Sequence, residues 1–188
     1  MLKQIVAALL LTAAVTFAGA PAKAENFTLN DYNGNAVSLA DFKDAAAIVV
    51  MFISTECPVS NAYNERMAAL HNDYKGKKVV VVGINSNKAE TPEDIKNHAA
   101  DQGFGFTILK DVNNIIADKF EANHTPETYI LNPSTLEVLY HGRIDDSQRE
   151  KKVTKNDLRA ALDEILAGKA VTVKETKAFG CTIKRVEK

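Results

Sequence analysis

The two cysteines, Cys57 and Cys181, are the side chains best suited to redox chemistry in this 188-residue chain. Cys57 follows a strongly apolar run, and Pro58 comes directly after it. Proline is tolerated in the first turn of a helix, because its missing N–H would have no partner there. A helix start also favours thiolate over thiol, although Glu56 opposes a second negative charge. The junction therefore predicts a nucleophilic sulfur on Cys57, and a cysteine that merely packs there is the alternative.

The first 24 residues have the layout of a secretory signal peptide. Lys3 gives a positive start, residues 5–17 are almost entirely apolar, and an A-K-A triplet ends at Ala24. The apolar core is short for a membrane span, so we expect cleavage and no stable membrane anchor. Export across the inner membrane to the periplasm would put both cysteines where disulfides persist.

Composition excludes several classes of partner and enzyme. Without residues 1–24, which hold two lysines and no acid, the chain keeps 21 basic and 24 acidic residues, a formal charge of −3. This balance favours neither nucleic acid nor an anionic membrane. No phosphate-binding glycine loop, H-E-x-x-H or G-x-S-x-G motif occurs, and we expect no cofactor and no metal. We predict one domain over residues 25–169 and a tail, residues 170–188, that carries Cys181.

Hydrophobic periodicity predicts the elements that must position Cys57. Residues 47–53 and 79–84 are continuous apolar runs, typical of strands buried on both faces. Apolar residues from Val59 to Tyr74 recur every three or four positions, which predicts an amphipathic helix. The other predicted elements are a hairpin turning at Asn33-Gly34, a helix capped by Thr91, a strand over 106–109, a helix over 112–120, strands over 128–131 and 136–141, and a last helix capped by Thr154.

This order predicts an α/β fold with a mixed central sheet, helices on both faces and an N-terminal β-hairpin. Alternating strands and helices give parallel neighbours through right-handed crossovers. Strands 128–131 and 136–141 are joined too tightly to be parallel, so the sheet must be mixed. Reactive groups in such sheets lie beyond the carboxyl ends of strands, where we expect Cys57.

The buried strand, the Cys-Pro pair at a helix start and the later Thr125-Pro126 before a strand together resemble the thioredoxin fold. The stretch N-G-N-A-V-S-L-A-D-F, residues 33–42, resembles the redoxin branch, which holds the alkyl hydroperoxide reductase/thiol-specific antioxidant proteins and exported thioredoxin-like proteins. The resemblance extends to about Gly168. It implies that Pro126 is cis and faces Cys57. Protein thiols, disulfides or a peroxide are then the expected substrates, with an electron donor that the sequence does not identify.

Two departures from these family patterns bear on the chemistry. Ser60 stands where thioredoxins carry the second cysteine of C-x-x-C, so a dithiol at the helix start is not available. Peroxiredoxins carry a motif that resembles P-x-x-x-T-x-x-C, with an arginine nearby. In this chain Val50 stands in place of the proline and Ser54 in place of the threonine. Ser54 can still hydrogen-bond a thiolate or a peroxide. Arg66 and Arg143 are candidate substitutes for the positive charge of the arginine in the peroxiredoxin pattern.

Cys181 lies in the tail sequence F-G-C-T-I-K-R, where Gly180 permits backbone conformations that let the sulfur approach another surface. Related exported redoxin-like proteins have a similar G-C-x-I-K ending alongside C-P-V-S, which implies that the two cysteines act together. Cys181 is then a resolving thiol that attacks a mixed disulfide or sulfenic acid on Cys57. A purely structural disulfide, worth about 4–5 kcal/mol in the chain-entropy model, and two unpaired thiols are the alternatives.

We therefore expect an exported thiol–disulfide oxidoreductase with Cys57 as nucleophile and Cys181 as resolving cysteine. His124 neighbours the Thr125-Pro126 loop, where it would stabilise a thiolate or shuttle a proton, unless it is an exposed loop histidine. A thiol-dependent peroxidase on the same cysteines is the alternative enzyme. A binding module without catalysis, stapled by a Cys57–Cys181 disulfide, is the alternative from another class.

Overall fold

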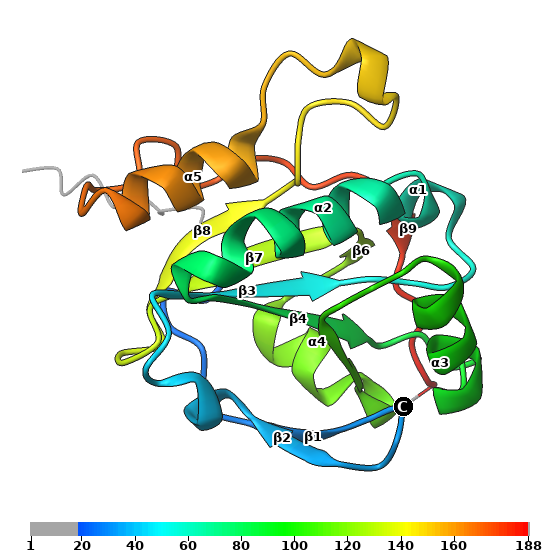
Figure 1. Ribbon diagram of the computed structural model, residues 1–188. Coiled ribbons are helices and arrows are strands. Elements are labelled where there is room, and N and C mark those ends of the chain that lie inside the picture. The colour runs from blue at the N-terminus through cyan, green and yellow to red at the C-terminus, as the bar shows by residue number, and fades with distance from the viewer. Residues whose placement is uncertain (1–18, 188) are drawn as a thin grey trace, which may run out of the picture.

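The computed structural model describes residues 19–187, so most of the predicted signal peptide (residues 1–24) lies outside the described residues. Seven strands form one mixed sheet in the order β2-β1-β5-β4-β3-β7-β8. Figure 1 shows β3 and β4 side by side in the middle of this sheet. β3, β4 and β5 are parallel, and the remaining neighbours are antiparallel. The strands of this sheet are β1 (Thr28–Asp31), β2 (Ala36–Ser38), β3 (Ala47–Phe52), β4 (Val79–Asn85), β5 (Thr107–Lys110), β7 (Glu127–Leu131) and β8 (Val138–Gly142). A second, two-stranded sheet consists of β6 (His124–Thr125) and β9 (Cys181–Thr182).

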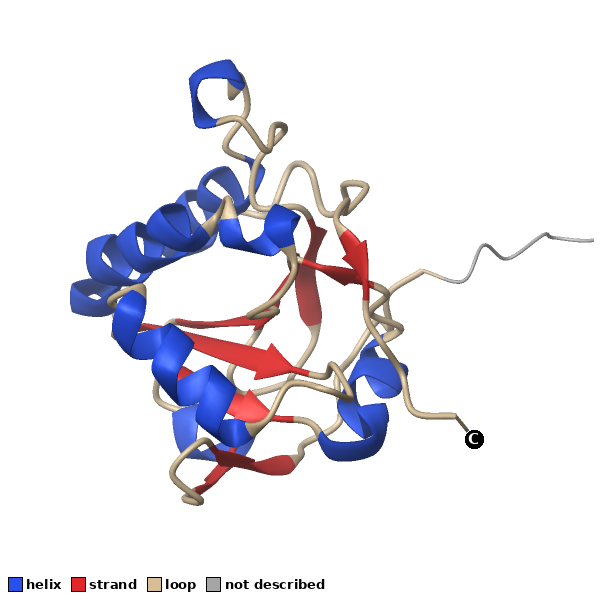
Figure 2. Cartoon of the chain, turned by 90° about the vertical axis from the view of Figure 1, so that its right-hand side faces the viewer, coloured by secondary structure: helices blue, strands red, loops and turns tan. Residues whose placement is uncertain are grey.

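Helices lie on both sides of the large sheet, and the turned view of Figure 2 shows the loop around Glu150–Lys152 standing away from the body. The α-helices are α1 (Pro58–Asn61), α2 (Asn64–Tyr74), α3 (Pro92–Asp101), α4 (Ile115–Phe120) and α5 (Asp157–Leu166), and the 3₁₀ helices are η1 (Leu39–Phe42), η2 (Lys75–Lys77), η3 (Val112–Asn114) and η4 (Glu150–Lys152). Among residues 19–187, no helix combines the length and the apolar character that crossing a membrane requires.

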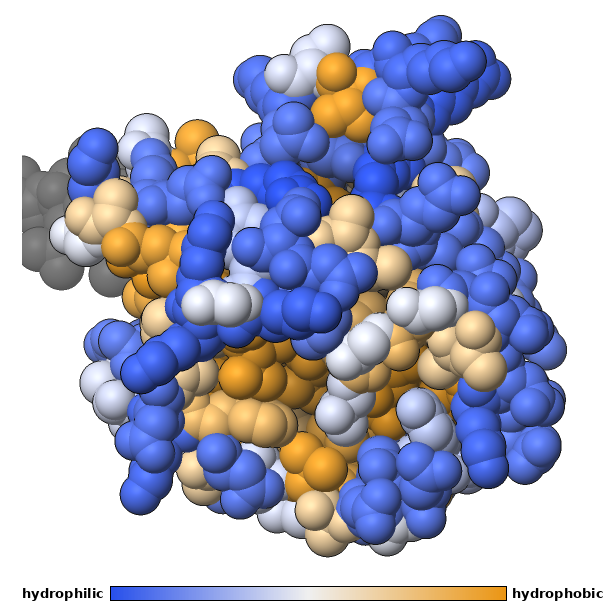
Figure 3. Space-filling view, in the orientation of Figure 1, coloured by the Kyte–Doolittle hydropathy of each residue, from blue (hydrophilic) through white to orange (hydrophobic). Residues whose placement is uncertain are grey.

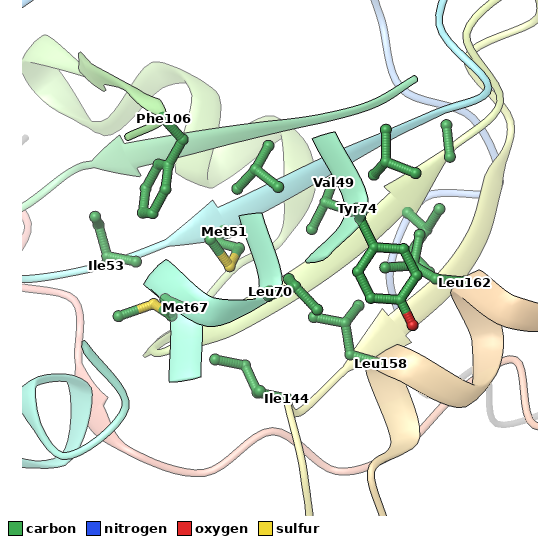
Figure 4. Packing of buried hydrophobic residues seen from close by; sticks show 14 of the residues in the cluster. Val49, Met51, Ile53, Met67, Leu70, Tyr74, Phe106, Ile144, Leu158 and Leu162 are labelled. Atoms are coloured by element: carbon green, nitrogen blue, oxygen red, sulfur yellow. The ribbon is translucent and has the colours of Figure 1, made fainter. Parts of the chain in front are cut away.

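The large sheet separates two apolar cores, and β3 contributes to both because successive side chains of a strand point to opposite faces. Val49 and Met51 belong to the core beneath α2 and α5, where Figure 4 shows Leu70 and Leu158 packed above them. The alternate residues of β3, with Val50 among them, face the second core on the side of α4. All six residues of β3 are buried, which confirms the strand predicted from the continuous apolar run.

Three predicted helix boundaries are wrong. The helix expected from 59 to 74 is interrupted between Asn61 and Asn64, so that α1 and α2 are separate. The helix expected from residue 112 starts at Ile115, because the two asparagines before it have positive φ. The last helix begins at Asp157, and Thr154 instead hydrogen-bonds Asp146. The predicted capping box that opens α3 is confirmed.

The face of the molecule shown in Figure 3 is polar around the η4 loop and apolar in the hollow between α2 and the β1–β2 hairpin. The hairpin itself joins the sheet through the antiparallel pairing of β1 with β5. The hairpin thus extends the sheet, and the hollow lies between this extension and α2. The mixed α/β class and the N-terminal hairpin expected from the sequence are both confirmed.

Candidate active site

Cys57 lies beyond the carboxyl end of β3 and is the N-cap residue of α1, as the sequence predicted. The backbone N–H of Ser60 donates to Cys57 Sγ at 3.3 Å. Ser54 Oγ accepts the Cys57 N–H at 3.0 Å, which fixes the turn between the strand and the helix. Only 5% of Cys57 is exposed. The sulfur is therefore held by its own helix start, in a position that favours negative charge on it.

A disulfide joins Cys57 to Cys181, and neither cysteine is free. The register of the two short strands produces this pairing, because Thr125 of β6 lies opposite Cys181 of β9. The Thr125–Pro126 peptide bond is cis, as the family resemblance implied, and the Thr125 carbonyl oxygen lies 3.3 Å from Cys57 Sγ. Both cysteines and the cis-proline loop thus meet at one point of the sheet edge.

Gly180 allows the tail to approach the cis-proline loop closely. Its φ is +158°, and a Cβ atom at this position would lie 2.1 Å from the Thr125 carbonyl oxygen. A side chain of any size would therefore push the tail away from Thr125. The sequence interpretation of Gly180 as a residue that lets the sulfur approach agrees with this geometry.

Contacts on both sides of Cys181 hold the tail on the core independently of the disulfide. Before it, Thr176 Oγ1 lies 2.8 Å from Tyr140 Oη, and the Thr176 N–H donates to the His141 carbonyl. After it, Ile183 is buried and its N–H donates to the Asn123 carbonyl at 3.0 Å. Further hydrogen bonds join Lys184 to Asn87, Arg185 to Asp118 and Val186 to Asn114.

Glu90 is a buried carboxylate beside the Cys57 turn that the sequence reasoning missed. It is 2% exposed and accepts hydrogen bonds from Ser54 Oγ (2.6 Å), from the Thr55 N–H and hydroxyl (2.6 and 2.8 Å), and from Asn85 Nδ2 (2.5 Å). Since Ser54 Oγ in turn accepts the Cys57 N–H, Glu90 supports the reactive turn through Ser54. The one available signal was an acid directly before the Thr91 cap, in the polar stretch that follows β4.

Glu127 is a second buried carboxylate that sequence reasoning missed, and it directly follows the cis proline. One oxygen accepts the N–H groups of Asn123 and His124, both at 2.8 Å, and the other lies 2.7 Å from His141 Nε2. Burial by itself would raise the pKa of Glu127, but the hydrogen bonds from His141 and the two backbone N–H groups outweigh it and hold the pKa below its usual range. The charged carboxylate shapes the loop that carries Thr125.

His124 lies in β6 with its ring directed toward Glu127 rather than in hydrogen-bond contact with a sulfur. Its Nδ1 is 3.7 Å from Glu127 Oε2, and its side chain is 38% exposed. His124, Glu127, His141 and Glu175 line a cleft of about 470 Å³ beside the tail. Within residues 19–187, no group of three or more histidine, cysteine or acidic side chains is arranged to hold a metal ion.

The two arginines considered as substitutes for a peroxide-binding cation are engaged elsewhere. Arg66 pairs with buried Asp145 at 2.5 Å and donates to two backbone carbonyls of the loop that leads to η4. Arg143 pairs with Asp157 at 2.7 Å, and that hydrogen bond raises its pKa. Ser54, the proposed hydroxyl for a thiolate or a peroxide, donates to Glu90 instead. Hydrogen bonds therefore hold Cys57 in place. The side chains of Arg66, Arg143 and Ser54 all bind other partners, so none of them is directed toward a peroxide at the sulfur.

Comparison with known proteins was consistent with this geometry. Residues 20–144 match the AhpC/TSA family. The chain is 26% identical over 110 residues to the thiol-disulfide oxidoreductase ResA of Bacillus subtilis (strain 168), covering 58% of this chain and 60% of that protein. It is 27% identical over 138 residues to the chloroplastic peroxiredoxin Q of Oryza sativa subsp. japonica, covering 69% and 61%. The chain thus spans about three fifths of the length of either relative.

A solved structure of a hypothetical protein from Sinorhizobium meliloti 1021 is similar along nearly its whole length. The two share 36% sequence identity and a TM-score of 0.84, over 92% of this chain and 98% of the other. With the sheet order described above, these likenesses confirm the predicted thioredoxin-like fold of the redoxin type.

The change Glu90→Gln tests the support of the turn. The amide NH₂ of the new side chain would replace one carboxylate oxygen and face the donors of Ser54, Thr55 or Asn85 without accepting a hydrogen bond. We therefore expect the free energy of unfolding to fall by about 1–3 kcal/mol. Denaturant unfolding measures this loss. Glu93→Gln, an exposed change on the neighbouring helix, is the control and should stay within about 0.5 kcal/mol of the wild type. Equal effects of the two changes would contradict the supporting role.

Replacing Gly180 by alanine should undock the tail around Cys181, because the new Cβ collides with the Thr125 carbonyl. Hydrogen exchange at the Ile183 amide should then become much faster. Gly168→Ala is the matched control, since Gly168 also has positive φ (+70°) but has open space around it. The control should lose only about 1–2 kcal/mol to backbone strain and keep the Ile183 amide protected. Unchanged protection in Gly180→Ala would refute the steric argument.

Proposed function

The chain belongs to the AhpC/TSA family, and on that premise we propose that it is an exported thiol–disulfide oxidoreductase that works through the Cys57–Cys181 pair. The observation that carries this proposal is the disulfide between the cysteine at the end of β3 and the tail, beside the cis proline. The signal-peptide pattern of residues 1–24 supports export to the periplasm, where such a pair can be oxidised.

In the proposed reaction, the Cys57 thiolate attacks one sulfur of a substrate disulfide and releases the other as a thiolate. Cys181 then attacks Cys57 in the mixed disulfide, which frees the substrate as a dithiol and leaves the intramolecular Cys57–Cys181 bond. Two electrons pass from the protein to the substrate, and the released thiolates take protons from solvent. The Ser60 N–H at Cys57 Sγ supports the thiolate, and pairing of β9 with β6 keeps Cys181 at hand.

The anchoring of the tail means that the folded protein can keep the two cysteines together after the disulfide is reduced. A disulfide stabilises mainly by restricting the unfolded chain, so the contacts that hold the folded tail are independent of that contribution. Here Thr176 and Ile183 already fix the tail on both sides of Cys181. A bond that is not required to hold the tail is available for cycling between the oxidised and reduced states.

Substitution of each cysteine tests the proposed roles. Cys57→Ser should abolish insulin reduction, whereas Cys181→Ala should accumulate a mixed disulfide on Cys57 that mass spectrometry detects. The midpoint potential of the pair should lie in the range of about −120 to −270 mV, whereas a structural disulfide should lie below about −300 mV. Insulin reduction by Cys57→Ser at the wild-type rate, or a potential in the lower range, would favour the stapled binding module.

Peroxide turnover distinguishes the alternative enzyme, a thiol-dependent peroxidase. Rapid reduction of a peroxide needs groups that bind it and polarise the O–O bond, but Arg66, Arg143 and Ser54 are held by other partners. We expect the second-order rate constant with hydrogen peroxide to stay within about tenfold of a free thiol of equal pKa. Stopped-flow measurement on the reduced protein gives this rate. A value thousands of times higher would establish the peroxidase instead.

A further inference from the structure

We propose that Lys110 is a positioning residue for the Cys57 thiolate and acts on it through Asn85 and Glu90. This inference rests on the proposed function, because it concerns how the nucleophilic sulfur is kept charged. The contacts of Glu90 hold the turn before Cys57 in place. They also bring a negative charge close to a sulfur that must itself become negative, so the site needs a positive charge to balance Glu90.

The register of the sheet brings the Lys110 ammonium to the end of β4. Asn85 ends β4 and Lys110 ends β5, and the two residues are direct partners in the parallel pairing of these strands. Lys110 Nζ donates to Asn85 Oδ1 at 3.1 Å and to the Asn87 carbonyl oxygen at 2.6 Å. Because β3, β4 and β5 are parallel, the ammonium lies at the same edge of the sheet at which β3 leads to Cys57.

The Asn85 amide links the ammonium to Glu90. Asn85 is 1% exposed, and its Nδ2 donates to Glu90 Oε2 at 2.5 Å while its Oδ1 accepts from Lys110. An amide has one donor end and one acceptor end, so the lysine and the carboxylate together determine its orientation. Glu90 Oε1 in turn accepts the Ser54 hydroxyl, whose oxygen accepts the Cys57 N–H. A continuous chain of hydrogen bonds therefore runs from Lys110 to Cys57.

The charge of Lys110 has the sign that a thiolate at Cys57 requires. A carboxylate near a thiol disfavours ionisation of that thiol, and an ammonium beside the carboxylate offsets the effect. Burial lowers the pKa of Lys110, while the negative charges of Glu90, Asp111 and Asp94 oppose that lowering. Two hydrogen-bond acceptors and three carboxylates thus favour the charged form of Lys110. Its positive charge reduces the repulsion between Glu90 and the Cys57 thiolate.

The other charged groups around this chain do not supply that balance. Three further carboxylates surround Lys110, and each accepts hydrogen bonds from donors of its own: Asp31 on β1, Asp94 on α3 and Asp111 after β5. The charge of Glu90 acts to raise the pKa of His98 on α3, but burial is the larger effect and lowers it overall. His98 is therefore mainly neutral at neutral pH, and Glu56, next to Cys57 in the chain, adds a negative charge.

The pH dependence of Cys57 alkylation tests this role, because a lysine that only fixes the strand ends would not change it. Each substitution is made in full-length Cys181→Ala protein, so that Cys57 is the sole thiol. Iodoacetamide is added at pH values from about 5 to 10, and intact mass gives the rate constant. Lys110→Met should move the midpoint of the profile to higher pH. At pH 7 the rate should fall about two- to fivefold, since the thiolate fraction falls more than its nucleophilicity rises.

Matched variants separate the charge of the lysine from its shape. Lys110→Arg keeps the positive charge and should keep the midpoint of the parent protein. Lys110→Gln keeps a donor for Asn85 without the charge and should move the midpoint in the same direction as Lys110→Met. Lys96→Met removes an exposed lysine from α3, where solvent screens the charge, and should leave the rate within about 1.5-fold of the parent.

An unmoved midpoint in the neutral variants would overturn the inference and leave the proposed function standing, even where denaturant unfolding shows a loss of stability. If Lys110→Met fails to fold, Lys110→Gln decides. If neither neutral variant folds, Lys110 is a structural residue and the inference falls. A parent protein whose Cys57 reacts no faster at pH 7 than the cysteine of an unstructured peptide would contradict the proposed function itself, because the sulfur would then not be activated.

Discussion

The pairing of β9 with β6 is the contact on which the rest of the site depends. It brings Cys181 opposite Thr125, and Thr125 in turn lies against Cys57. Gly180 makes this possible, because any side chain there would collide with the Thr125 carbonyl. A two-residue strand forms few hydrogen bonds, so its position relies on the buried side chain of Ile183 that follows it. One small strand pairing thus converts a distant tail into part of the redox site.

Two buried carboxylates hold the loops on either side of the disulfide. Glu90 supports the turn that leads into Cys57, and Glu127 supports the loop that ends in Thr125. Burying a charged carboxylate is costly unless several donors satisfy it. Each of these two takes part in four hydrogen bonds, which offset that cost and hold each loop in one conformation. The sulfurs themselves therefore sit between rigid supports on the core.

The same arrangement favours thiol exchange over peroxide chemistry at this site. Exchange needs an activated sulfur, a second sulfur within bonding distance and a route for the partner. The helix start at Cys57 supplies the first, and Cys181 supplies the second. Peroxide reduction also needs a cation and a free hydroxyl beside the sulfur. The arginines and Ser54 are instead used to fix the η4 loop, α5 and the reactive turn.

The sequence by itself determined the sheet and the helix start at Cys57, because these depend on local periodicity and on residues next to one another. The importance of Thr125-Pro126 was implied by the resemblance to a known family. The sequence also pointed to Gly180 as a residue of permissive conformation. Tertiary structure alone decided that Glu90 and Glu127 belong to the site, since isolated acids in a polar stretch have no periodic signal and acquire partners only when loops meet. It likewise decided that Arg66 and Arg143 are not available to the sulfur. Their salt-bridge partners, Asp145 and Asp157, are brought to them by the fold.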